Sequence, residues 1–297
     1  MKDRLLAGRV AIITGSGGGL GRCHALELAR HGARVVVNDI SHELAESVAT
    51  EIHAEGGNAI AFATSVTDET GVEAMVDRTI CEWGRIDILV NNAGILRDRS
   101  FAKMTMDDFR LVVDVHLLGA AMCTKAVWNI MREQRYGRVV MTTSSSGLYG
   151  NFGQANYGAA KMALVGLMQT LAIEGEKYGI RVNCLAPTAA TQMTGDVLSD
   201  EALACLDPAL VSPGVVALVE ENAPTRRILC AGAGHFACAN VTLTNGLFIG
   251  AGAEAAERIA ESWDIISDPE GDEVPDYGFA QAEREIASAG CSAPAVP

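Results

Sequence analysis

VAIITGSGGGLG, residues 10–21, decides the fold of this chain. The apolar run 10–14 predicts a buried strand, and a glycine-rich turn leads from it directly into a helical pattern at 19–31. Glycine allows positive φ in the turn, close approach of a pyrophosphate to the backbone, and tight packing of helix on strand. Because a helix N-terminus also presents N–H groups and a positive dipole to phosphates, the stretch predicts a dinucleotide site.

The same alternation of strand and helix continues from Arg9 to about Asn183, which predicts βαβ units on a parallel sheet. We expect strands at 10–14, 34–39, 58–64, 86–92, 137–143 and 180–186, a seventh at 246–252, and helices at 19–31, 42–56, 68–83, 105–134 and 154–178. Thr105 and Ser212 are expected N-caps. The predicted fold class is α/β: one Rossmann-type, doubly wound, parallel seven-stranded sheet with helices on both faces, in a single domain.

The predicted organisation has two parts. Residues 1–262 form the nucleotide-binding domain, with a flap at about 188–210 beside the site, because loops at the C-terminal ends of such strands carry substrate. Residues 263–297 form an acidic C-terminal extension with a short helix near 279–288. Between Asp264 and Pro297 there are eight acidic residues and one basic residue, so we expect a solvated acidic tail.

Composition excludes several classes of function. A formal net charge of −14 argues against nucleic acid as a partner, because phosphate binding needs clustered Lys and Arg. No apolar run of about 18 residues predicts a membrane span, and the start lacks an apolar signal region, so we expect a cytoplasmic protein. The eight cysteines are scattered without a C-x-x-C pair, and Cys230, His235 and Cys238 lack a fourth ligand, so we expect reduced thiols and no metal.

Asp39 bears on the choice of cofactor. It ends the second predicted strand, 18 residues beyond Gly21, where a carboxylate can accept hydrogen bonds from both ribose hydroxyls. A 2′-phosphate would meet like charge there, and no basic residue lies in 16–18 or directly after Asp39. The sequence therefore predicts NAD rather than NADP.

Three residues form a candidate acid–base set. Tyr157 and Lys161 lie one helical turn apart, so they share a helix face. A nearby ammonium, together with the positive nicotinamide, stabilises a phenolate and lowers the pKa of the phenol. Ser144, at the end of the fifth predicted strand, can hold a substrate oxygen while Tyr157 takes its proton. Each residue alone also fits an ordinary structural role; their joint placement after a nucleotide turn favours catalysis.

TGSGGGLG, the NNAG turn at 91–94, Ser144, and Tyr157 with Lys161 together resemble the short-chain dehydrogenase/reductase family over about residues 5–252. The resemblance implies a nicotinamide cofactor and Ser–Tyr–Lys catalysis. The family usually has an asparagine where this chain has His116, for which catalytic and structural roles both stay open. The implied cofactor contacts are Gly15, Ser16, Gly19, Leu20, Gly21, Asp39, Ser65, Val66, Asn92, Ala93, Gly94, Tyr157, Lys161, Pro187, Thr188 and Thr191.

Residues 91–102, 136–157 and 171–187 are more closely similar to the (3R)-hydroxyacyl-CoA dehydrogenase domain of peroxisomal multifunctional enzymes of type 2, a group that includes 17β-hydroxysteroid dehydrogenases. That likeness implies a small lipid-like substrate, a 3-hydroxyacyl-CoA or a hydroxysteroid. Arg97, Arg99 and Lys103 then either meet CoA phosphates or are ordinary surface charge.

Two other functions stay open: a 3-oxoacyl carrier-protein reductase, and a non-catalytic NAD-binding sensor. Relatives in the family are usually dimers or tetramers. Helices 105–134 and 154–178 are apolar over more than one face, so we expect a homodimer or homotetramer built through them.

Overall fold

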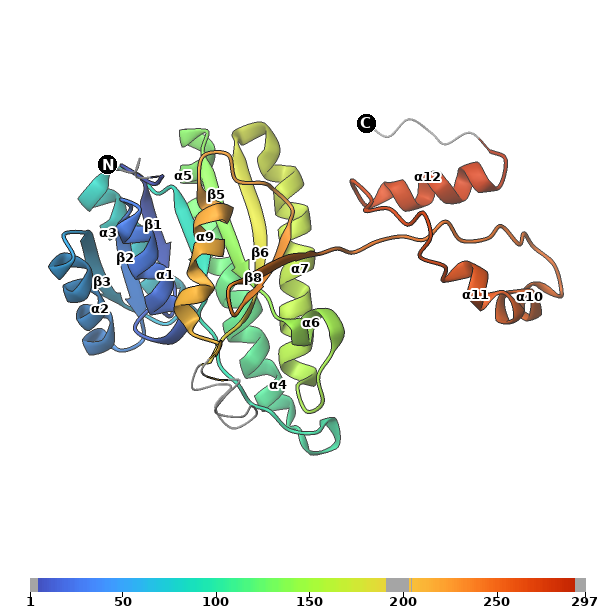
Figure 1. The fold of residues 1–297 in the computed structure, drawn as a ribbon, viewed down its shortest axis with the longest axis horizontal. Helices are drawn as coiled ribbons and strands as arrows, with labels where there is room; N and C mark the ends of the chain where they lie inside the picture. Colours follow the sequence, from blue (N-terminus) through green and yellow to red (C-terminus); the bar gives the residue numbers. More distant parts are fainter. Residues whose placement is uncertain (1–4, 191–202, 204, 292–297) are drawn as a thin grey trace. The chain divides into compact units, whose positions relative to one another are not determined.

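An eight-stranded sheet forms the centre of the computed structural model, which describes residues 5–190, 203 and 205–291 (Figure 1). The strand order is β3-β2-β1-β4-β5-β6-β7-β8; all neighbours are parallel except the antiparallel pair β7 and β8. The strands are β1 (Val10–Ile13), β2 (Arg34–Asp39), β3 (Asn58–Ala63), β4 (Ile88–Asn91), β5 (Gly137–Thr142), β6 (Ile180–Thr188), β7 (Ile228–Gly232) and β8 (His235–Ala239). The order reverses between β1 and β4, which is the switch point where such sheets bind ligands.

Helices cover both faces of the sheet, and alternate strand residues pack against them. Ile13 and Val35 belong to the core under α1, α2 and α9, whereas Ile12 and Val36 belong to the core under α3, α5 and α7. These helices are α1 (Gly19–Arg30), α2 (His42–Ala54), α3 (Glu69–Trp83), α5 (Gly119–Gln134), α7 (Ala155–Gly175) and α9 (Ser212–Val219). Shorter elements are η1 (Phe101–Lys103), α4 (Met106–Val113), the π-helical turn η2 (Asp114–Leu118), α6 (Ser145–Tyr149), η3 (Glu176–Tyr178) and η4 (Pro208–Leu210).

The predicted α/β class, the two-sided helical cover and the first six strands are confirmed, but the seventh strand was placed wrongly. Residues 246–252 form no strand, and Gly246, Gly250 and Gly252 all have positive φ. The sheet is instead completed by the β7–β8 hairpin, whose turn residues Ala233 and Gly234 have φ of 51° and 74°. Two consecutive positive φ values suit a tight hairpin, so the Ala-Gly pair between apolar runs was the missed signal.

Of the two expected caps, one is confirmed and one is wrong. The Thr105 hydroxyl accepts a hydrogen bond from the Asp108 N–H at 3.0 Å and caps α4. Ser212 is the first residue of α9 and caps nothing, because its hydroxyl lies 2.8 Å from Nδ1 of the buried His24 on α1. That contact fixes α9 against the helix that follows the glycine-rich turn.

The continuous helical stretch Met106–Gln134, from α4 through η2 to α5, is long and apolar enough to cross a membrane by length and composition. Core helices of globular proteins meet the same criterion. Here Cys123, Val127 and Met131 of α5 are buried in the core on one face of the sheet, and the stretch is read as a core helix.

The chain divides into two compact units, Met1–Ala239 and Asn240–Pro297, so the boundary predicted at 262/263 lies inside the second unit. The second unit contains α10 (Ala255–Glu261), α11 (Trp263–Ile266) and α12 (Phe279–Ser288), and α12 confirms the short helix expected near 279–288. Within it, Leu243 and Glu273 form a β-bridge and Arg284 pairs with Glu273. Most of the predicted flap, including Thr191, lies outside the described residues.

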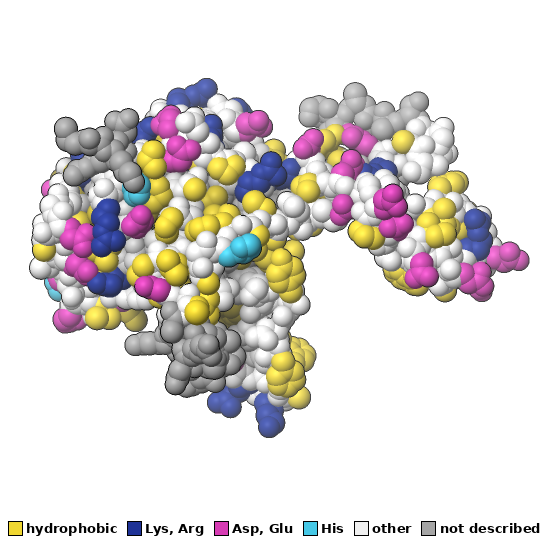
Figure 2. Space-filling view, in the orientation of Figure 1, with side chains coloured by type: hydrophobic (Ala, Val, Ile, Leu, Met, Phe, Trp, Pro, Cys, Tyr) yellow, Lys and Arg dark blue, Asp and Glu magenta, His cyan; other side chains and the backbone are white. Residues whose placement is uncertain are grey.

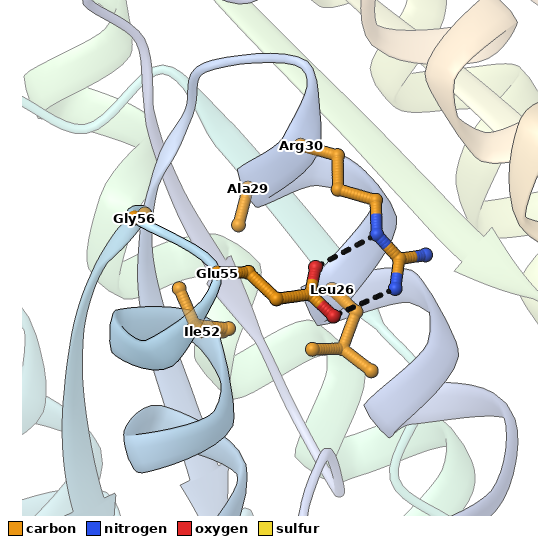
Figure 3. A pocket seen from close by; sticks show the side chains of 7 residues that line it. Leu26, Ala29, Arg30, Ile52, Glu55 and Gly56 are labelled. Atoms are coloured by element: carbon orange, nitrogen blue, oxygen red, sulfur yellow. Dashed lines mark hydrogen bonds and ion pairs between the residues drawn. The ribbon is translucent and has the colours of Figure 1, made fainter.

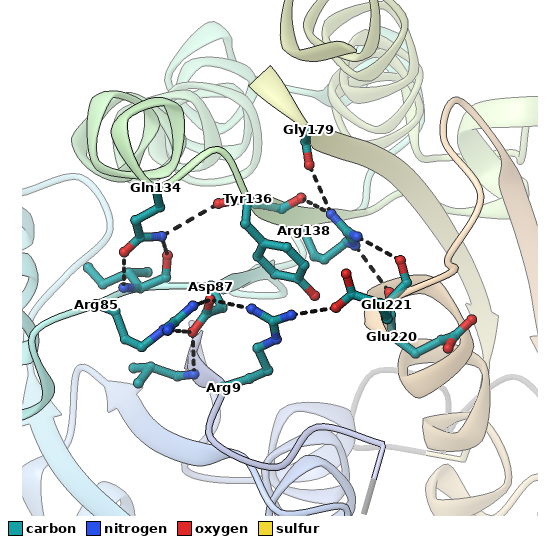
Figure 4. A network of polar contacts seen from close by, with 12 residues as sticks. Arg9, Arg85, Asp87, Gln134, Tyr136, Arg138, Gly179, Glu220 and Glu221 are labelled. Atoms are coloured by element: carbon teal, nitrogen blue, oxygen red, sulfur yellow. Dashed lines mark hydrogen bonds and ion pairs between the residues drawn. The ribbon is translucent and has the colours of Figure 1, made fainter. Parts of the chain in front are cut away.

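Asp87 organises the edge of the sheet at which the strands begin (Figure 4). Its buried carboxylate accepts hydrogen bonds from Arg9 at 3.2 Å, from Arg85 at 2.6 and 2.8 Å, and from the Val10 N–H at 2.9 Å. Arg9 also stacks on the Tyr136 ring, with its guanidinium carbon 3.6 Å from the ring centroid. One carboxylate thus connects the start of β1 to the segment that precedes β4.

Replacing Asp87 by Ala is expected to lower the free energy of unfolding by about 2–3 kcal/mol, because it leaves the Arg85 guanidinium and the buried Val10 N–H without this acceptor and leaves Arg9 with Glu221 as its carboxylate partner. Urea denaturation measures the change. The matched control is Asp107→Ala, which removes an exposed partner of Arg110 and is expected to cost much less. Equal losses in the two variants would contradict the role given to Asp87.

Candidate functional site

The glycine-rich turn between β1 and α1 packs closely against Ala93 and against its own backbone. Gly15 has φ of +61°, and a Cβ on it would lie 2.8 Å from the Ala93 Cα. A Cβ on Gly21 would lie 2.2 Å from the Gly15 carbonyl oxygen. Gly18, by contrast, is exposed with nothing within 4 Å of a built Cβ, so the backbone in front of the α1 N-terminus is open to a ligand.

The turn is held to the NNAG segment after β4 by side chains. The Asn92 amide donates to the carbonyls of Thr14 and Gly15 at 2.9 and 3.0 Å, and the Thr14 hydroxyl accepts from the N–H groups of Asn92 and Ala93 at 3.0 and 3.1 Å. The structure therefore brings Gly15, Gly21, Asn92 and Ala93 together, as predicted. Sequence analysis missed Thr14, although it stands directly before the first glycine.

Of the predicted cofactor contacts in the turn, Ser16 is buried, whereas Gly19 and Leu20 are accessible. Ser16 is fully buried: its hydroxyl donates to the Ile13 carbonyl at 2.8 Å and its N–H to the Asn38 carbonyl at 2.7 Å. Both polar groups are therefore used inside the protein, and this geometry does not support its predicted cofactor contact. Gly19 has φ of +52° and begins α1, followed by the half-buried Leu20, so these two residues lie at the open end of the turn.

Asp39 ends β2 beside this turn. Its Oδ2 accepts from the Gly17 N–H at 3.0 Å, and its Oδ1 accepts from the Ser41 N–H at 3.1 Å. Each carboxylate oxygen keeps a further lone pair, so the group can still accept from two hydroxyls. Neither of these two hydrogen-bond partners is basic.

The other predicted cofactor contacts lie at the C-terminal ends of neighbouring strands. Ser65 and Val66 follow β3, Gly94 is the last residue of the NNAG turn, and Pro187 and Thr188 end β6. Because the parallel strands end at one edge, these segments lie along the same side of the sheet as the glycine-rich turn.

Ser144, Tyr157 and Lys161 meet at this edge. Ser144 follows β5 at the start of α6, Tyr157 and Lys161 share a face of α7, and the Ser144 hydroxyl lies near enough to the Tyr157 phenol to lower its pKa. The Lys161 ammonium lies 5.4 Å from the centroid of the Tyr157 ring. It donates to the Thr142 carbonyl at the end of β5 at 2.6 Å, and this bond fixes the buried lysine side chain next to the phenol.

Burial governs the protonation of this set in the free protein. It raises the pKa of the Tyr157 phenol, against the lowering effect of the nearby Ser144 hydroxyl. Burial also lowers the pKa of Lys161 to about 7, so the lysine is only partly charged near neutral pH. In the free protein the phenol is therefore not made basic, and a second positive charge is needed beside it.

His116 lies in the π-helical turn η2 and touches Tyr157 edge-on, with ring centroids 5.2 Å apart. Its Nε2 is 2.8 Å from the Ile95 carbonyl oxygen and 3.1 Å from the Ile95 nitrogen. Burial, aided by the charge of Lys161, lowers the pKa of His116 to about 3, so the ring is neutral. Gly94 makes room for it, since a Cβ there would lie 2.3 Å from Cε1.

A small, mostly apolar pocket lies beside His116 and Lys161, and Asn91 also lines it. Two of these residues carry a buried polar atom without a protein partner in the described chain, Asn91 Oδ1 and His116 Nδ1. A second pocket, of about 150 Å³, lies between α1 and α2 and is closed on one side by the Arg30–Glu55 ion pair (Figure 3). It contains none of the predicted site residues, so the candidate site is the strand edge described above.

A Rossmann-type sheet with a glycine-rich turn and a Ser–Tyr–Lys set at one edge is typical of nucleotide-dependent oxidoreductases. The chain belongs to the short chain dehydrogenase family, whose model matches residues 9–202, and it is an oxidoreductase of that family. This confirms the family inferred from the motifs.

Several relatives are similar over most of this chain. The chain is 51% identical over 72% of its length to the peroxisomal hydratase-dehydrogenase-epimerase of Saccharomyces cerevisiae, and 49% identical over 72% to the peroxisomal multifunctional enzyme type 2 of Drosophila melanogaster. It spans only 25% and 37% of those proteins. The solved Drosophila structure matches 95% of this chain with a TM-score of 0.80, and a 7α-hydroxysteroid dehydrogenase complexed with NADH is 31% identical with a TM-score of 0.73.

The predicted cytoplasmic location is wrong. The relatives from Saccharomyces, Drosophila, mouse and Neurospora are all named as peroxisomal enzymes. The prediction depended on the lack of an apolar N-terminal signal, which cannot separate these compartments, because peroxisomal addresses are short sequences read by receptors rather than apolar segments.

Lys161→Met is expected to stabilise the fold while it abolishes activity. The Lys161 pKa lies near 7 in the folded protein and near its ordinary value, about 10.4, in the unfolded chain. Folding therefore favours the deprotonated lysine, and the free energy of unfolding of the wild type rises with pH between these two pKa values. The variant should gain about 1–2 kcal/mol at about pH 6 and progressively less towards about pH 10.

Chemical denaturation across this pH range measures the effect. Lys177→Met, at an exposed position, is the control and should show no such pH-dependent gain. A destabilised Lys161→Met protein at about pH 6 would show that the Thr142 hydrogen bond outweighs the cost of burying the ammonium.

Proposed function

We propose that the chain interconverts a secondary alcohol and a ketone with NAD, and that its substrate is a 3-hydroxyacyl-CoA. The observation that carries the proposal is that Ser144, Tyr157 and the buried Lys161 meet at the strand edge that also bears the open glycine-rich turn. This arrangement can hold one oxygen, move one proton, and exclude water from below the phenol.

Tyr157 is the proposed acid–base residue. In alcohol oxidation its phenolate takes the hydroxyl proton, while the Ser144 hydroxyl holds the substrate oxygen in place. The bound nicotinamide supplies the hydride acceptor and a positive charge. Because burial alone raises the Tyr157 pKa, the phenolate forms only with that charge and a protonated Lys161 nearby.

His116 is the proposed positioning residue behind the phenol. As a neutral ring fixed at Ile95 it cannot act as the base, but its edge supports the Tyr157 ring. Asn91, His116 and Lys161 line one small pocket, so the ring lies next to the lysine that supports the phenol.

The residues present fit NAD. Gly18 leaves the α1 N-terminus open to a pyrophosphate, and Asp39 keeps acceptor capacity for two ribose hydroxyls. Gly19, Leu20, Ser65, Val66, Ala93, Gly94, Pro187 and Thr188 are proposed to line the rest of the dinucleotide site. The negative charge of Asp39 disfavours a 2′-phosphate.

The relatives support the acyl-CoA substrate. Multifunctional enzymes with hydratase and dehydrogenase in their names match this chain at 43–51% identity. Among the solved structures, the Drosophila multifunctional enzyme is 36% identical to this chain and the hydroxysteroid dehydrogenase 31%. A second candidate is supported by the 3-oxoacyl-[acyl-carrier-protein] reductase of Synechocystis, 42% identical over 67% of this chain.

We also propose a homodimer or homotetramer through α4, α5 and α7. Large apolar side chains are exposed on α4, on η2 directly before α5, and on α7: Met106, Leu111, Leu118, Met162 and Ile173. Helices of this kind commonly bury such side chains against a symmetric copy.

Tyr157→Phe is expected to lower kcat about a thousandfold, because it removes the proton acceptor and keeps the ring. NADH binding, followed by protein-to-nicotinamide fluorescence transfer, should stay similar to that of the wild type. Tyr178→Phe, on η3, is the matched control and should keep its turnover. A Tyr157→Phe protein with wild-type turnover would instead favour a base elsewhere, and a wild type without turnover would favour a sensor.

Asp39→Ala is expected to raise the ratio of kcat/KM for NADP to kcat/KM for NAD about tenfold, because it removes the charge that opposes a 2′-phosphate. Steady-state kinetics with both cofactors measure the ratio. Glu43→Ala, an exposed carboxylate at the start of α2, serves as the control and should leave the ratio unchanged. A wild type that prefers NADP would contradict the assignment of Asp39.

A further inference from the structure

A short basic and aromatic surface lies beside the proposed active site; we call Arg97, Arg99, Phe101, Lys103 and Phe152 the basic rim. The first four belong to the segment that follows β4, and Phe152 belongs to the segment between α6 and α7. Figure 2 shows dark blue Lys and Arg side chains protruding at the lower end of the first unit, with exposed apolar side chains nearby.

The backbone of the basic rim is hydrogen-bonded to the segment at the start of α7, the helix that carries Tyr157. The Arg99 N–H donates to the Gly153 carbonyl at 2.9 Å, and the Asn156 amide donates to the Arg97 carbonyl at 3.1 Å. The Gln154 amide donates to the Asp98 carboxylate at 2.6 Å. Asn156 precedes Tyr157 directly, so the basic rim flanks the approach to the phenol.

The charges of the basic rim are available to a ligand. The segment 95–104 has three basic side chains and one acidic one, in a chain whose net charge is −14. Arg97, Arg99 and Lys103 are exposed, and none of the three forms an ion pair with any residue that the structure describes. Arg97 donates only to the neighbouring Leu96 carbonyl, at 2.7 Å. A local positive field of this kind attracts phosphates.

Two aromatic rings lie in the same segments. Phe101 is 71% exposed and Phe152 is 90% exposed. Rings this exposed do not stabilise the core, and an aromatic face beside guanidinium groups suits the stacking of a nucleobase. A sterol has neither phosphates nor a base to use these features.

We infer that the basic rim is the subsite for the 3′-phosphoadenosine diphosphate head of an acyl-CoA, with the phosphates at Arg97, Arg99 and Lys103 and the adenine against an exposed phenylalanine. The inference rests on the proposed function, because the pantetheine arm must join this head to an acyl group whose hydroxyl reaches Tyr157. It assigns a binding site to the CoA head, the part of the substrate that the Ser144–Tyr157–Lys161 set does not contact.

The test compares one 3-oxoacyl group on two carriers, as the CoA thioester and as the N-acetylcysteamine thioester, with NADH consumption as the readout. In Arg99→Glu/Lys103→Glu, kcat/KM for the CoA thioester should fall about tenfold at low ionic strength, mainly through KM. The loss should shrink with added salt, and the short thioester should show no matching loss. Lys177→Glu, on η3 away from the strand edge that bears the site, is the control for charge and should lose neither activity.

Equal losses with both thioesters, or none with the CoA thioester, would overturn the subsite while the proposed function stands. The acyl carrier-protein thioester is assayed as a third substrate: a loss seen only with it would assign the basic rim to an acidic protein partner and overturn the subsite too. Wild-type inactivity towards both small thioesters would reject the proposed substrate and the subsite together.

Discussion

The hydrogen bonds between Thr14 and Asn92 are the constraint on which the site depends. They join the turn after β1 to the turn after β4, the two strands between which the sheet reverses its order. On one side of this junction lies the open N-terminus of α1, and on the other lie Gly94 and His116. A shift between these strands would therefore separate the proposed cofactor site from the proposed acid–base set.

The electrostatics of the site follow from burial more than from pairing. Burial lowers the pKa of Lys161 and His116 and raises that of Tyr157, so all three groups tend towards their neutral forms in the free protein. A neutral site is less costly to fold than a charged one. The proposed chemistry then depends on charge that arrives with the cofactor, which would couple proton removal to cofactor binding.

The two ends of the strands differ in how their buried polar groups are satisfied. At the edge where the strands begin, Asp87 and its arginine partners form a satisfied network that connects separate segments. At the other edge, Asn91 Oδ1 and His116 Nδ1 are buried without a protein partner in the described chain. Unsatisfied polar groups lower stability, so their position next to Lys161 agrees with a functional role. The basic rim extends this second edge outward.

The sequence by itself determined the fold class and six strands, because glycine spacing and apolar periodicity are local signals, and it predicted the set of Tyr157, Lys161 and Ser144 that the structure brings to one strand edge. Only the tertiary structure decided what depends on packing: the β7–β8 hairpin, the inward-facing Ser16, and Ser212 bonded to His24 rather than capping α9. The raised pKa of Tyr157 belongs to this second group as well. Spacing along a helix shows which side chains are neighbours, whereas burial, which sets their protonation, depends on every element packed around them.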